Sequence, residues 1–455
     1  MAPKFGTSGL RGLVRELTPE LVADYTRAFV AACPMGTGLW VGRDLRDSSC
    51  QLAECVIAAA RAEGVIVTDC GAVPTPALAM AAMGAGAASV MVTGSHIPAD
   101  RNGLKFYVPG GEITKADEAA ILAALGRPAG QECAARRANG GVGGDWAARY
   151  RGAFGRALEG MKIGVWQHSA VSRDLLVICL EAMGARVAPL GRTTDFVPVD
   201  TEAVPQAVRA QFADWAGMGL DAIVSTDGDG DRPLVADAAG QIVPGDVLGQ
   251  ITAALLGAEI VVTTVSANSG AHLSGRFGQV IRTRIGSPFV IAAMDAVGAR
   301  VVGYEPNGGF LLGFHVDGPA GPLPPLMTRD SLLPIVATLI AAKAAGGLAA
   351  CVAQEPARFT VTDRLENVPT DAGQGLVSRL GDAAALADFL APLGAVDRVD
   401  RTDGVRVWLV GGDIVHLRPS GNAPEFRVYA EAGSPATAAA RMAAAFDLVR
   451  AALAG

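Results

Sequence analysis

Residues 162–187 read KIGVWQHSAVSRDLLVICLEAMGARV, and the order of residue types in this stretch decides the fold class. The β-branched run at 162–166 predicts a strand, and the segment 173–183 predicts a helix that ends at a small-residue break. A second apolar run begins at 185–187. Strand, polar turn, helix and strand in this order form a βαβ unit, which brings parallel strands into one sheet.

The same order recurs at 39–68 and at 259–302, each time with Gly-Val or Gly-Ala-Arg-Val ahead of the second strand. Repeats this far apart are of domain size, so they predict an internal repeat of α/β domains rather than a solenoid. The sheets of these domains are expected to be largely parallel.

The C-terminal part has a different pattern. Apolar runs at 405–410, 413–418 and 425–430 are typical of a half-buried antiparallel sheet, which a helix at 436–453 would cover. The predicted fold is therefore α/β, with three similar mixed α/β domains followed by an α+β domain. We expect the four domains at 1–153, 154–248, 249–355 and 356–455.

Composition excludes several function classes. The 455 residues, half of them apolar, suffice for about three domains and a sizeable core. A net charge of −7 argues against a nucleic-acid partner, because no basic stripe is available to displace counterions from phosphates. The seven cysteines form no CxxC pair, which is typical of buried thiols in a reducing compartment.

Two features argue against export or a membrane. Residues 1–11 contain no apolar run, so we expect no signal peptide. The longest apolar stretch, 334–353, is interrupted by Lys343 and a glycine pair, and it predicts a core helix rather than a membrane span. We expect a cytoplasmic protein, monomeric or homodimeric, with neither a membrane nor a nucleic-acid partner.

The serine loop, Gly94-Ser-His-Ile-Pro98, follows a strand predicted at 88–93. A serine at the carboxyl end of a parallel strand lies where α/β proteins bind their ligands. Gly94 permits a sharp turn there. Taken alone, Ser95 is explained more simply as a capping residue of an ordinary loop. A hydrolase elbow is disfavoured, because Ile97 stands where Gly-x-Ser-x-Gly needs its last glycine.

The aspartate loop, Asp227-Gly-Asp-Gly-Asp-Arg232, follows a strand predicted at 221–226. Its three carboxylates can converge on one hard cation, because the glycines between them let the backbone curl. An EF-hand is excluded, since Arg232 stands where its invariant glycine is required and Ala238 where its bidentate glutamate is required. Three protein ligands leave room for a phosphate oxygen, as Mg²⁺ prefers.

Two further polar loops follow predicted strands. The glutamate loop, 303–309, offers Glu305 and Asn307, whose oxygen and amide groups suit sugar hydroxyls, although an ordinary turn explains it equally well. The arginine loop, 416–425, offers side chains and a backbone N–H that could form an oxyanion cradle. The members of this cradle are Arg418, Ser420, Gly421 and Asn422.

Taken in order over essentially the whole chain, these loops resemble the α-D-phosphohexomutase superfamily. The segment 6–12, GTSGLRG, is similar to the first motif of that family, 93–98 to its phosphoserine loop and 227–232 to its metal loop. The resemblance implies an enzyme of four domains around a central cleft, each domain giving one loop. It also implies phosphoryl transfer between O1 and O6 of a hexose. Mg²⁺ would be the cofactor, and a hexose 1,6-bisphosphate would be both intermediate and activator.

The resemblance implies a role for each matching residue. Ser95 would carry the phosphoryl group, and as phosphoserine it would share Mg²⁺ with three carboxylates, those of Asp227, Asp229 and Asp231. Lys105 would be the general acid/base and His96 would order the serine loop, while two arginines, Arg11 and Arg232, would neutralise the phosphate. Sugar hydroxyls would be bound by Glu305 and Asn307. The distal phosphate of the phosphorylated hexose would be bound by Arg418, Ser420, Gly421 and Asn422.

Two departures from the family pattern concern substrate choice. Asn307 replaces the serine of the usual Gly-Glu-x-Ser-Gly, and Asn422 replaces a usual threonine. Glucose and mannose differ only in the configuration at C2, and the glutamate loop is not expected to bind the sugar at that position. Overall similarity favours phosphomannomutase activity, with phosphoglucomutase close behind, and Gly230 weakens the phosphoglucosamine option. A phosphatase and a non-catalytic sugar-phosphate-binding protein stay open as alternatives.

Overall fold

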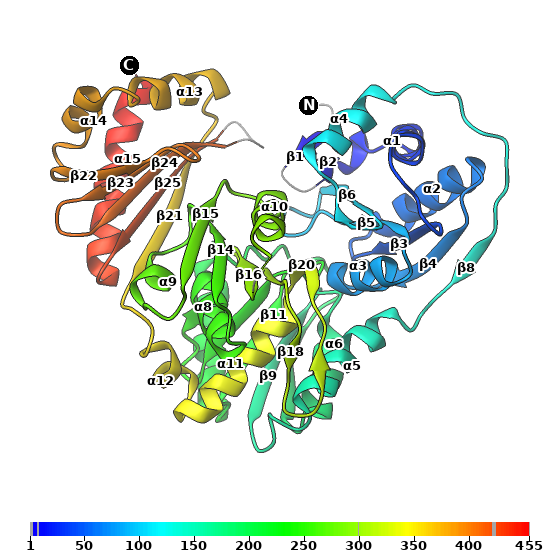
Figure 1. The fold of residues 1–455 in the computed structure, drawn as a ribbon, viewed down its shortest axis with the longest axis horizontal. Helices are drawn as coiled ribbons and strands as arrows, with labels where there is room; N and C mark the ends of the chain where they lie inside the picture. Colours follow the sequence, from blue (N-terminus) through cyan, green and yellow to red (C-terminus); the bar gives the residue numbers. More distant parts are fainter. Residues whose placement is uncertain (1–2, 7–8, 299, 421–424, 455) are drawn as a thin grey trace.

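The computed structural model describes residues 3–6, 9–298, 300–420 and 425–454. Within them the chain forms four main sheets, one after another along the sequence. Figure 1 shows the first sheet, in blue and cyan, and the fourth, in orange and red, at opposite ends of the molecule, with the second and third between them. Three mixed α/β sheets followed by an antiparallel sheet confirm the predicted fold class.

The first sheet has a parallel centre from which the serine loop leaves. Strand β3 runs parallel to both β4 and β5, so the loops after β3 and β5 leave the same edge. The strand order is β1–β2–β6–β5–β3–β4–β8, with β7 paired to β6. The strands are β1 Lys4–Gly6, β2 Gly9–Leu13, β3 Leu39–Arg43, β4 Val67–Ala72, β5 Ala88–Val92, β6 Arg101–Val108, β7 Gly111–Glu112 and β8 Arg136–Ala138. The helices are η1 Val14–Glu16, α1 Pro19–Ala32, α2 Ser49–Ala62, α3 Thr75–Gly84, α4 Lys115–Ala123 and α5 Val142–Phe154.

The second and third sheets follow one plan, in which a parallel group is extended by antiparallel strands. Their strand orders are β10–β9–β11–β12–β13 and β15–β14–β16–β17–β20. The second comprises β9 Lys162–His168, α6 Arg173–Ala182, β10 Arg186–Arg192, α7 Gln206–Trp215, η2 Ala216–Met218, β11 Ala222–Thr226, β12 Pro233–Asp237 and β13 Ile242–Val243. The third comprises β14 Ile260–Thr264, α9 Gly270–Leu273, β15 Gln279–Thr283, α10 Ser287–Val297, β16 Val301–Tyr304, β17 Phe310–Leu312 and β20 Leu326–Asp330. Nearby elements are α8 Gly245–Leu255, the pair β18 Val316–Asp317 and β19 Pro322–Leu323, α11 Leu332–Ala345 and α12 Leu348–Val352.

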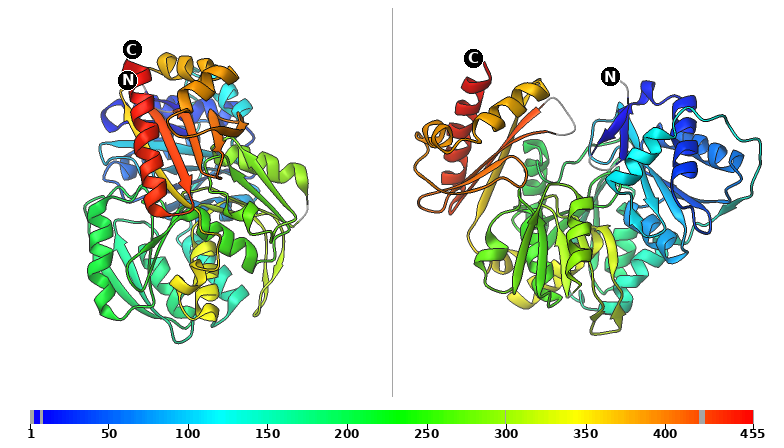
Figure 2. Two further views of the ribbon diagram at one scale, coloured as in Figure 1. Left: turned by 90° about the vertical axis from the view of Figure 1, so that its left-hand side faces the viewer. Right: turned by 45° about the horizontal axis from the view of Figure 1, so that its top comes forward.

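The fourth sheet is antiparallel throughout, in the order β21–β25–β24–β23–β22. Helix α15, Pro435–Ala454, packs along it as predicted, which Figure 2 shows most clearly in its left view. The strands are β21 Phe359–Glu366, β22 Val396–Asp400, β23 Val405–Leu409, β24 Ile414–Pro419 and β25 Glu425–Ala432. The other two helices are α13 Thr370–Arg379 and α14 Ala383–Leu390.

Two predictions about these elements are wrong in part. The sheets of the α/β part are less parallel than expected, because β12 and β17 return antiparallel directly after the aspartate and glutamate loops. Both loops are too short for the crossover that a parallel strand requires, which takes a dozen residues or more. The helix predicted at 334–353 is two helices, α11 and α12, separated by Gly346 and Gly347 with φ of 82° and 140°.

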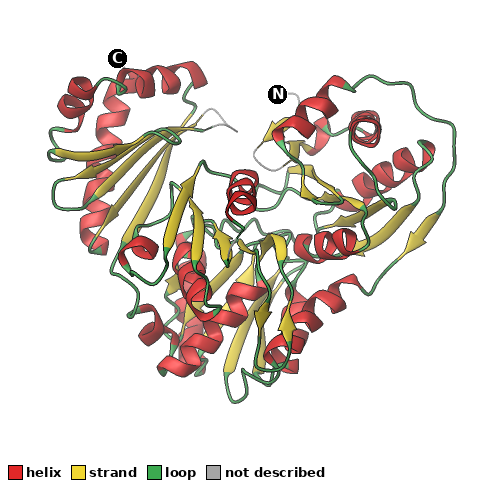
Figure 3. Cartoon of the chain, in the orientation of Figure 1, coloured by secondary structure: helices red, strands yellow, loops and turns green. Residues whose placement is uncertain are grey.

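The apolar core is divided unevenly among the sheets. One buried cluster runs through the second and third sheets and includes Trp146, Tyr150, Tyr304 and Phe310. The fourth sheet has a core of its own around Phe426. Helices lie beside the strands of every sheet (Figure 3). In the part of the chain that the structure describes, none of the helices is long and apolar enough to cross a membrane.

Candidate active site

Ser95 leaves the first sheet just after β5 and points at the aspartate loop of the second sheet. Its φ of 52° lies in the left-handed region that few residues other than glycine adopt. Its backbone N–H donates to Oγ1 of Thr93 at 2.7 Å, and its Oγ donates to Oδ2 of Asp227 at 2.7 Å. These bonds offset a local backbone cost on the order of 1 kcal/mol. The serine hydroxyl is therefore buried and held in one direction.

The aspartate loop is a tight hairpin between β11 and β12. The Asp227 backbone N–H donates to the Arg232 carbonyl at 3.1 Å. Oδ1 of Asp227 accepts from the backbone N–H groups of Gly230, Asp231 and Arg232 at 3.1, 3.2 and 3.3 Å. Gly230 has a φ of 76°, which this turn requires. The closed turn gathers one oxygen from each of Asp227, Asp229 and Asp231 within 4.8 Å of one another.

The three carboxylates fit a bound cation. All three are fully buried, and Oδ1 of both Asp229 and Asp231 has no hydrogen-bond partner in the described structure. Burial raises the pKa of Asp227 well above its ordinary value, and repulsion from Asp229 and Asp231 raises it further. A hard divalent cation would relieve this repulsion and engage the two oxygens that accept no hydrogen bond from the described residues. These residues could therefore hold a metal ion such as Mg²⁺.

Two cationic side chains meet at Asp231. Lys105, from β6, places its Nζ 2.6 Å from Oδ2 of Asp229 and 2.7 Å from Oδ2 of Asp231. Arg329, from β20 of the third sheet, places Nη2 3.0 Å from the same Asp231 oxygen. Burial alone would raise the pKa of Asp231, but Arg329 and Lys105 lower it below its ordinary value. The aspartate loop thus touches the first and the third sheet through charged groups.

His96 and Arg232 join the serine loop to the aspartate loop. Nη1 of Arg232 donates to Nδ1 of His96 at 2.8 Å, and that nitrogen lies 3.4 Å from Oγ of Ser95. Burial lowers the pKa of His96 well below its ordinary value, and Arg232 and Arg11 lower it further. The neutral ring can therefore accept the hydrogen bond from Arg232 at Nδ1.

Arg11 lies close to this group on strand β2. It is paired with Gly103 of β6, where an added Cβ would come within 2.2 Å of the Leu10 carbonyl oxygen. Burial and the nearby Arg232 lower the pKa of Arg11 to about 10. Because β2 lies close against β6, Arg11 brings a further positive charge near the aspartate loop.

The serine loop is built around Arg46, which the sequence analysis missed. The Arg46 guanidinium donates to four backbone carbonyls at 2.6–2.9 Å, those of Ser95, Ile97, Pro98 and Arg101. Its Nε lies 3.2 Å from Oδ2 of Asp44, which also accepts from Oγ1 of Thr93. Its other face stacks on the Phe196 ring, 3.9 Å from the centroid. Arg46 therefore holds the backbone of the serine loop in its conformation. It also packs this loop against Phe196, which follows β10 of the second sheet.

Replacing Arg46 by methionine is expected to lower kcat about 30- to 100-fold while leaving KM nearly unchanged, because the Arg46 guanidinium is engaged with backbone carbonyls of the serine loop. Arg46→Lys should lose less, since it keeps the charge but reaches fewer carbonyls. Steady-state kinetics on folded protein would measure both variants. Arg61→Met is the control, because Arg61 binds the Ala134 carbonyl far from the serine loop and should keep full activity. A rise in KM with unchanged kcat would contradict this role.

The glutamate loop lies beside this group. Glu305 and Asn307 are buried, 3% and 7% exposed. Oε2 of Glu305 is 3.6 Å from Nη1 of Arg329. Oδ1 of Asn307 accepts from the Gly309 backbone N–H at 3.0 Å, and the Asn307 carbonyl accepts from Thr201, which lies between β10 and α7. The loop is thus tied to the aspartate loop through Arg329.

The arginine loop lies apart, on the fourth sheet. Nε of Arg418 donates to Oδ1 of Asp403 at 2.8 Å, and the Ser420 backbone N–H donates to the Glu425 carbonyl at 2.8 Å. Gly421 and Asn422 lie outside the described residues. The other carboxylate oxygen of Asp403 accepts from the backbone N–H of Ile285, just after β15, at 3.1 Å.

Acid is expected to destabilise the fourth sheet through His416 on β24. Nε2 of His416 lies 2.6 Å from the Asp403 carbonyl, and burial lowers its pKa to about 4. The unfolded chain binds this proton at about pH 6.5. Stability is therefore full above that pH and falls as the pH drops from about 6.5 to about 4, by roughly 3 kcal/mol. Melting temperatures between pH 7 and pH 4.5 should fall less for His416→Gln than for the wild type. An equal fall in both would contradict the assignment.

The structure brings most of the predicted site residues together. Direct contacts join Ser95, His96, Lys105, Arg232 and the three aspartates. Glu305 joins them through Arg329, and Arg11 lies within electrostatic range. The roles of all these residues remain predictions.

Three stretches of the chain match one protein family, described as Phosphoglucomutase/phosphomannomutase. Its alpha/beta/alpha domain I matches residues 2–129, and its alpha/beta/alpha domain III matches residues 244–359. Its C-terminal domain matches residues 365–449. The matched stretches hold the serine, glutamate and arginine loops.

Two relatives align with nearly the whole chain. A phosphomannomutase of Sinorhizobium fredii is 45% identical, over 96% of this chain and 96% of the relative. A phosphomannomutase of Salmonella muenchen is 41% identical, over 94% of this chain and 92% of the relative. Among solved structures, a phosphoglucomutase/phosphomannomutase family protein of Burkholderia thailandensis has the same fold, with a TM-score of 0.78 at 22% identity, covering 98% of this chain and 96% of that one.

Proposed function

The chain belongs to the phosphoglucomutase/phosphomannomutase family of phosphohexomutases, and on that premise we propose that it interconverts mannose 1-phosphate and mannose 6-phosphate. The observation that carries the chemistry is the hydrogen bond from Oγ of Ser95 to Oδ2 of Asp227 at 2.7 Å, inside a buried group of three carboxylates. The two relatives at 45% and 41% identity, both phosphomannomutases, support mannose as the sugar.

Ser95 would carry the phosphoryl group on Oγ. Asp227, Asp229 and Asp231 would hold Mg²⁺ beside it, and the bound ion would neutralise charge on the phosphoserine oxygens. His96 and Arg232 hold the two loops against each other, and Arg232 and Arg11 would supply positive charge next to the phosphate. This arrangement suits phosphoryl transfer, which depends on positioning and charge neutralisation more than on covalent chemistry.

The same site would carry out two successive phosphoryl transfers, first from Ser95 to the sugar and then from the sugar back to Ser95. The P–O bond at Ser95 would break and the phosphorus would bond to the free hydroxyl of a mannose monophosphate, while Lys105, as general acid/base, would take the proton of that hydroxyl and pass it to Oγ of Ser95. The product would be a hexose 1,6-bisphosphate, which would turn round and give its other phosphate to Ser95, while Lys105 would pass the proton of the Ser95 hydroxyl to the sugar oxygen that is released. Glu305 and Asn307 would bind sugar hydroxyls in both orientations. The distal phosphate would be bound by Arg418, Ser420, Gly421 and Asn422.

The sugar is tested by turnover with Mg²⁺ and a trace of glucose 1,6-bisphosphate. We expect the highest kcat/KM for mannose 1-phosphate, compared with glucose 1-phosphate and glucosamine 1-phosphate. A higher value for glucose 1-phosphate would make the chain a phosphoglucomutase. Inorganic phosphate without any hexose 6-phosphate would instead identify a phosphatase.

A further inference from the structure

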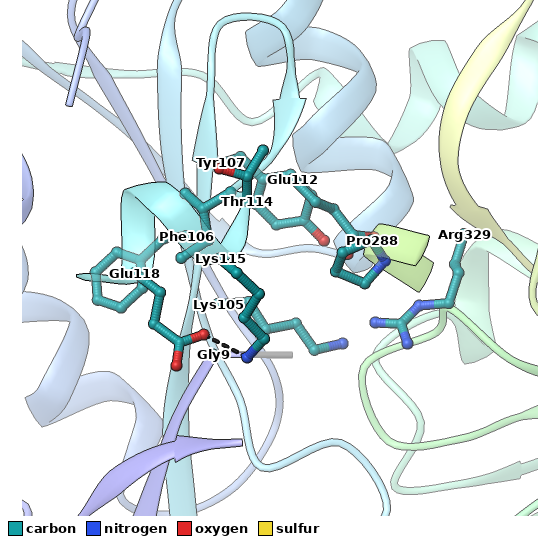
Figure 4. Close-up of a pocket in the computed structure, with 11 residues that line it drawn as sticks. Gly9, Lys105, Phe106, Tyr107, Glu112, Thr114, Lys115, Glu118, Pro288 and Arg329 are labelled. Atoms are coloured by element: carbon teal, nitrogen blue, oxygen red, sulfur yellow. Dashed lines mark hydrogen bonds and ion pairs between the residues drawn. The ribbon is translucent and has the colours of Figure 1, made fainter. Parts of the chain in front are cut away.

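Arg329 lies where three of the four sheets meet, and none of the recognised motifs contains it. Its side chain comes from β20 of the third sheet and is 3% exposed. Nη2 lies 3.0 Å from Oδ2 of Asp231 in the aspartate loop, and Nη1 lies 3.6 Å from Oε2 of Glu305 in the glutamate loop. Figure 4 shows its guanidinium and the Lys105 ammonium pointing toward each other in a pocket that Glu112 and Tyr107 also line.

The Arg329 guanidinium forms a bridge between Asp231 and Glu305 and compensates their buried negative charge. Asp231 and Glu305 are both buried, and each would be costly as an isolated charge. Asp231 also has an ion pair with a second cation, Lys105. Among the described residues, the ion pair of Glu305 is the one with Arg329. A guanidinium stays charged and offers donors in a fixed planar fork, so it can face two carboxylates at once.

The glutamate loop is shaped to admit this side chain. A Cβ on Gly309 would come within 2.9 Å of Cδ and 3.0 Å of Cγ of Arg329. The Gly309 backbone N–H in turn donates to Oδ1 of Asn307, the second predicted sugar-binding residue. The absence of a side chain at Gly309 thus lets Arg329 pass directly behind the residues expected to bind the sugar.

We propose that Arg329 is a positioning residue that ties the glutamate loop to the aspartate loop and so sets the distance between the sugar hydroxyls and the phosphoryl group on Ser95. This inference rests on the proposed mutase function. It assigns Arg329 no contact with the reacting atoms. Its effect would pass through Glu305, because Asp231, at the other end of the contact, keeps a second cation in Lys105.

Arg329→Met is expected to lower kcat for mannose 1-phosphate about 100-fold, the scale of a misplacement of about 1 Å. Arg329→Lys should recover little, because a point charge cannot span both carboxylates in the geometry of a fork. Arg276→Met is the control in the same part of the chain. Arg276 pairs with Glu355, away from the loops, and its variant should keep full activity.

A second readout separates positioning from general damage. Enzyme carrying labelled phosphate on Ser95 is followed alone and with mannose 1-phosphate. Loss of label to water needs the aspartate loop but not the glutamate loop, so Arg329→Met should lose label to water at the wild-type rate. It should pass label to the sugar about 100-fold more slowly. If both rates fell together, Arg329 would serve only the aspartate loop or the fold, and the proposal would be wrong.

A double-mutant cycle with Glu305→Gln tests the bridge itself. If Arg329 acts through Glu305, each single variant should lose roughly 30- to 100-fold in kcat/KM, and the double variant should lose little more. Losses that multiply, to roughly 1000-fold or more, would overturn the proposal. The wild type is measured in the same assay. If it fails to turn over mannose 1-phosphate, the proposed function fails. If it succeeds while Arg329→Met matches the control, only this inference fails.

Discussion

Replacing Ser95 by alanine is expected to lower kcat/KM at least about a thousandfold, equivalent to roughly 4 kcal/mol of transition-state stabilisation. The variant removes one oxygen atom, and that oxygen is the acceptor on which the proposed mechanism depends. Oγ of Ser95 is buried, and its hydrogen bond to Asp227 aims it at the carboxylates that would hold the metal ion. No neighbouring hydroxyl in the serine loop can replace it, because Thr93 Oγ1 is engaged with Asp44 and with the Ser95 backbone N–H.

Ser89→Ala is the matched control for this variant. Ser89 lies on β5, the strand that leads to the serine loop, and it is equally buried. Its Oγ has no hydrogen-bond partner in the described structure, so the alanine variant should keep both stability and activity. Near-normal turnover by Ser95→Ala would contradict the phosphoserine mechanism and favour a binding protein or a different nucleophile.

Asp229→Asn is expected to lower kcat roughly 100- to 1000-fold at saturating sugar, since a metal ion supplies several kcal/mol of charge stabilisation to phosphoryl transfer. The substitution keeps the shape of the side chain but removes one of three charges. Oδ2 of Asp229 also accepts from Oγ1 of Thr75 at 2.5 Å and from Nζ of Lys105 at 2.6 Å. The amide oxygen can keep one of these bonds, so the fold should survive.

Metal binding itself is measured by the effect of Mg²⁺ on the melting temperature. Mg²⁺ should raise the melting temperature of the wild type, because it binds the folded state alone, and it should have little effect on Asp229→Asn. Asp237→Asn is the control on the same hairpin. The Asp237 side chain accepts backbone N–H groups in the turn after β12, a role that asparagine can fill. An equal Mg²⁺ response in both variants would mean that the aspartate loop is not the metal site.

The βαβ units, the four polar loops and the C-terminal sheet were all visible in the sequence, because each depends on residues close together in the chain. The return strands β12 and β17 were not, although the loops ahead of them are too short for a crossover helix and so require antiparallel strands. The helix over 334–353 was predicted as one element because the apolar pattern continues past its glycine pair.

Arg46 and Arg329 were missed because their partners lie far away in the chain. Arg46 reads as part of a polar turn after β3, and its four carbonyl partners come from residues 95–101. Its position after a strand parallel to β5 was a usable signal, since the loops after both strands leave the same edge. Arg329 stands with Asp330 in an otherwise apolar segment, and two charges in such a segment indicate buried pairing.

The most direct test of the phosphoserine mechanism follows a labelled phosphate from Ser95. Wild-type enzyme is labelled on Ser95 from a labelled hexose 1,6-bisphosphate, freed of excess sugar, and mixed with unlabelled mannose 1-phosphate and Mg²⁺. The proposed mechanism predicts that label appears in mannose 1,6-bisphosphate and then in mannose 6-phosphate within the first turnovers, while Ser95→Ala takes up no label. Product formed while the label stays on the enzyme, or leaves only as inorganic phosphate, would contradict it.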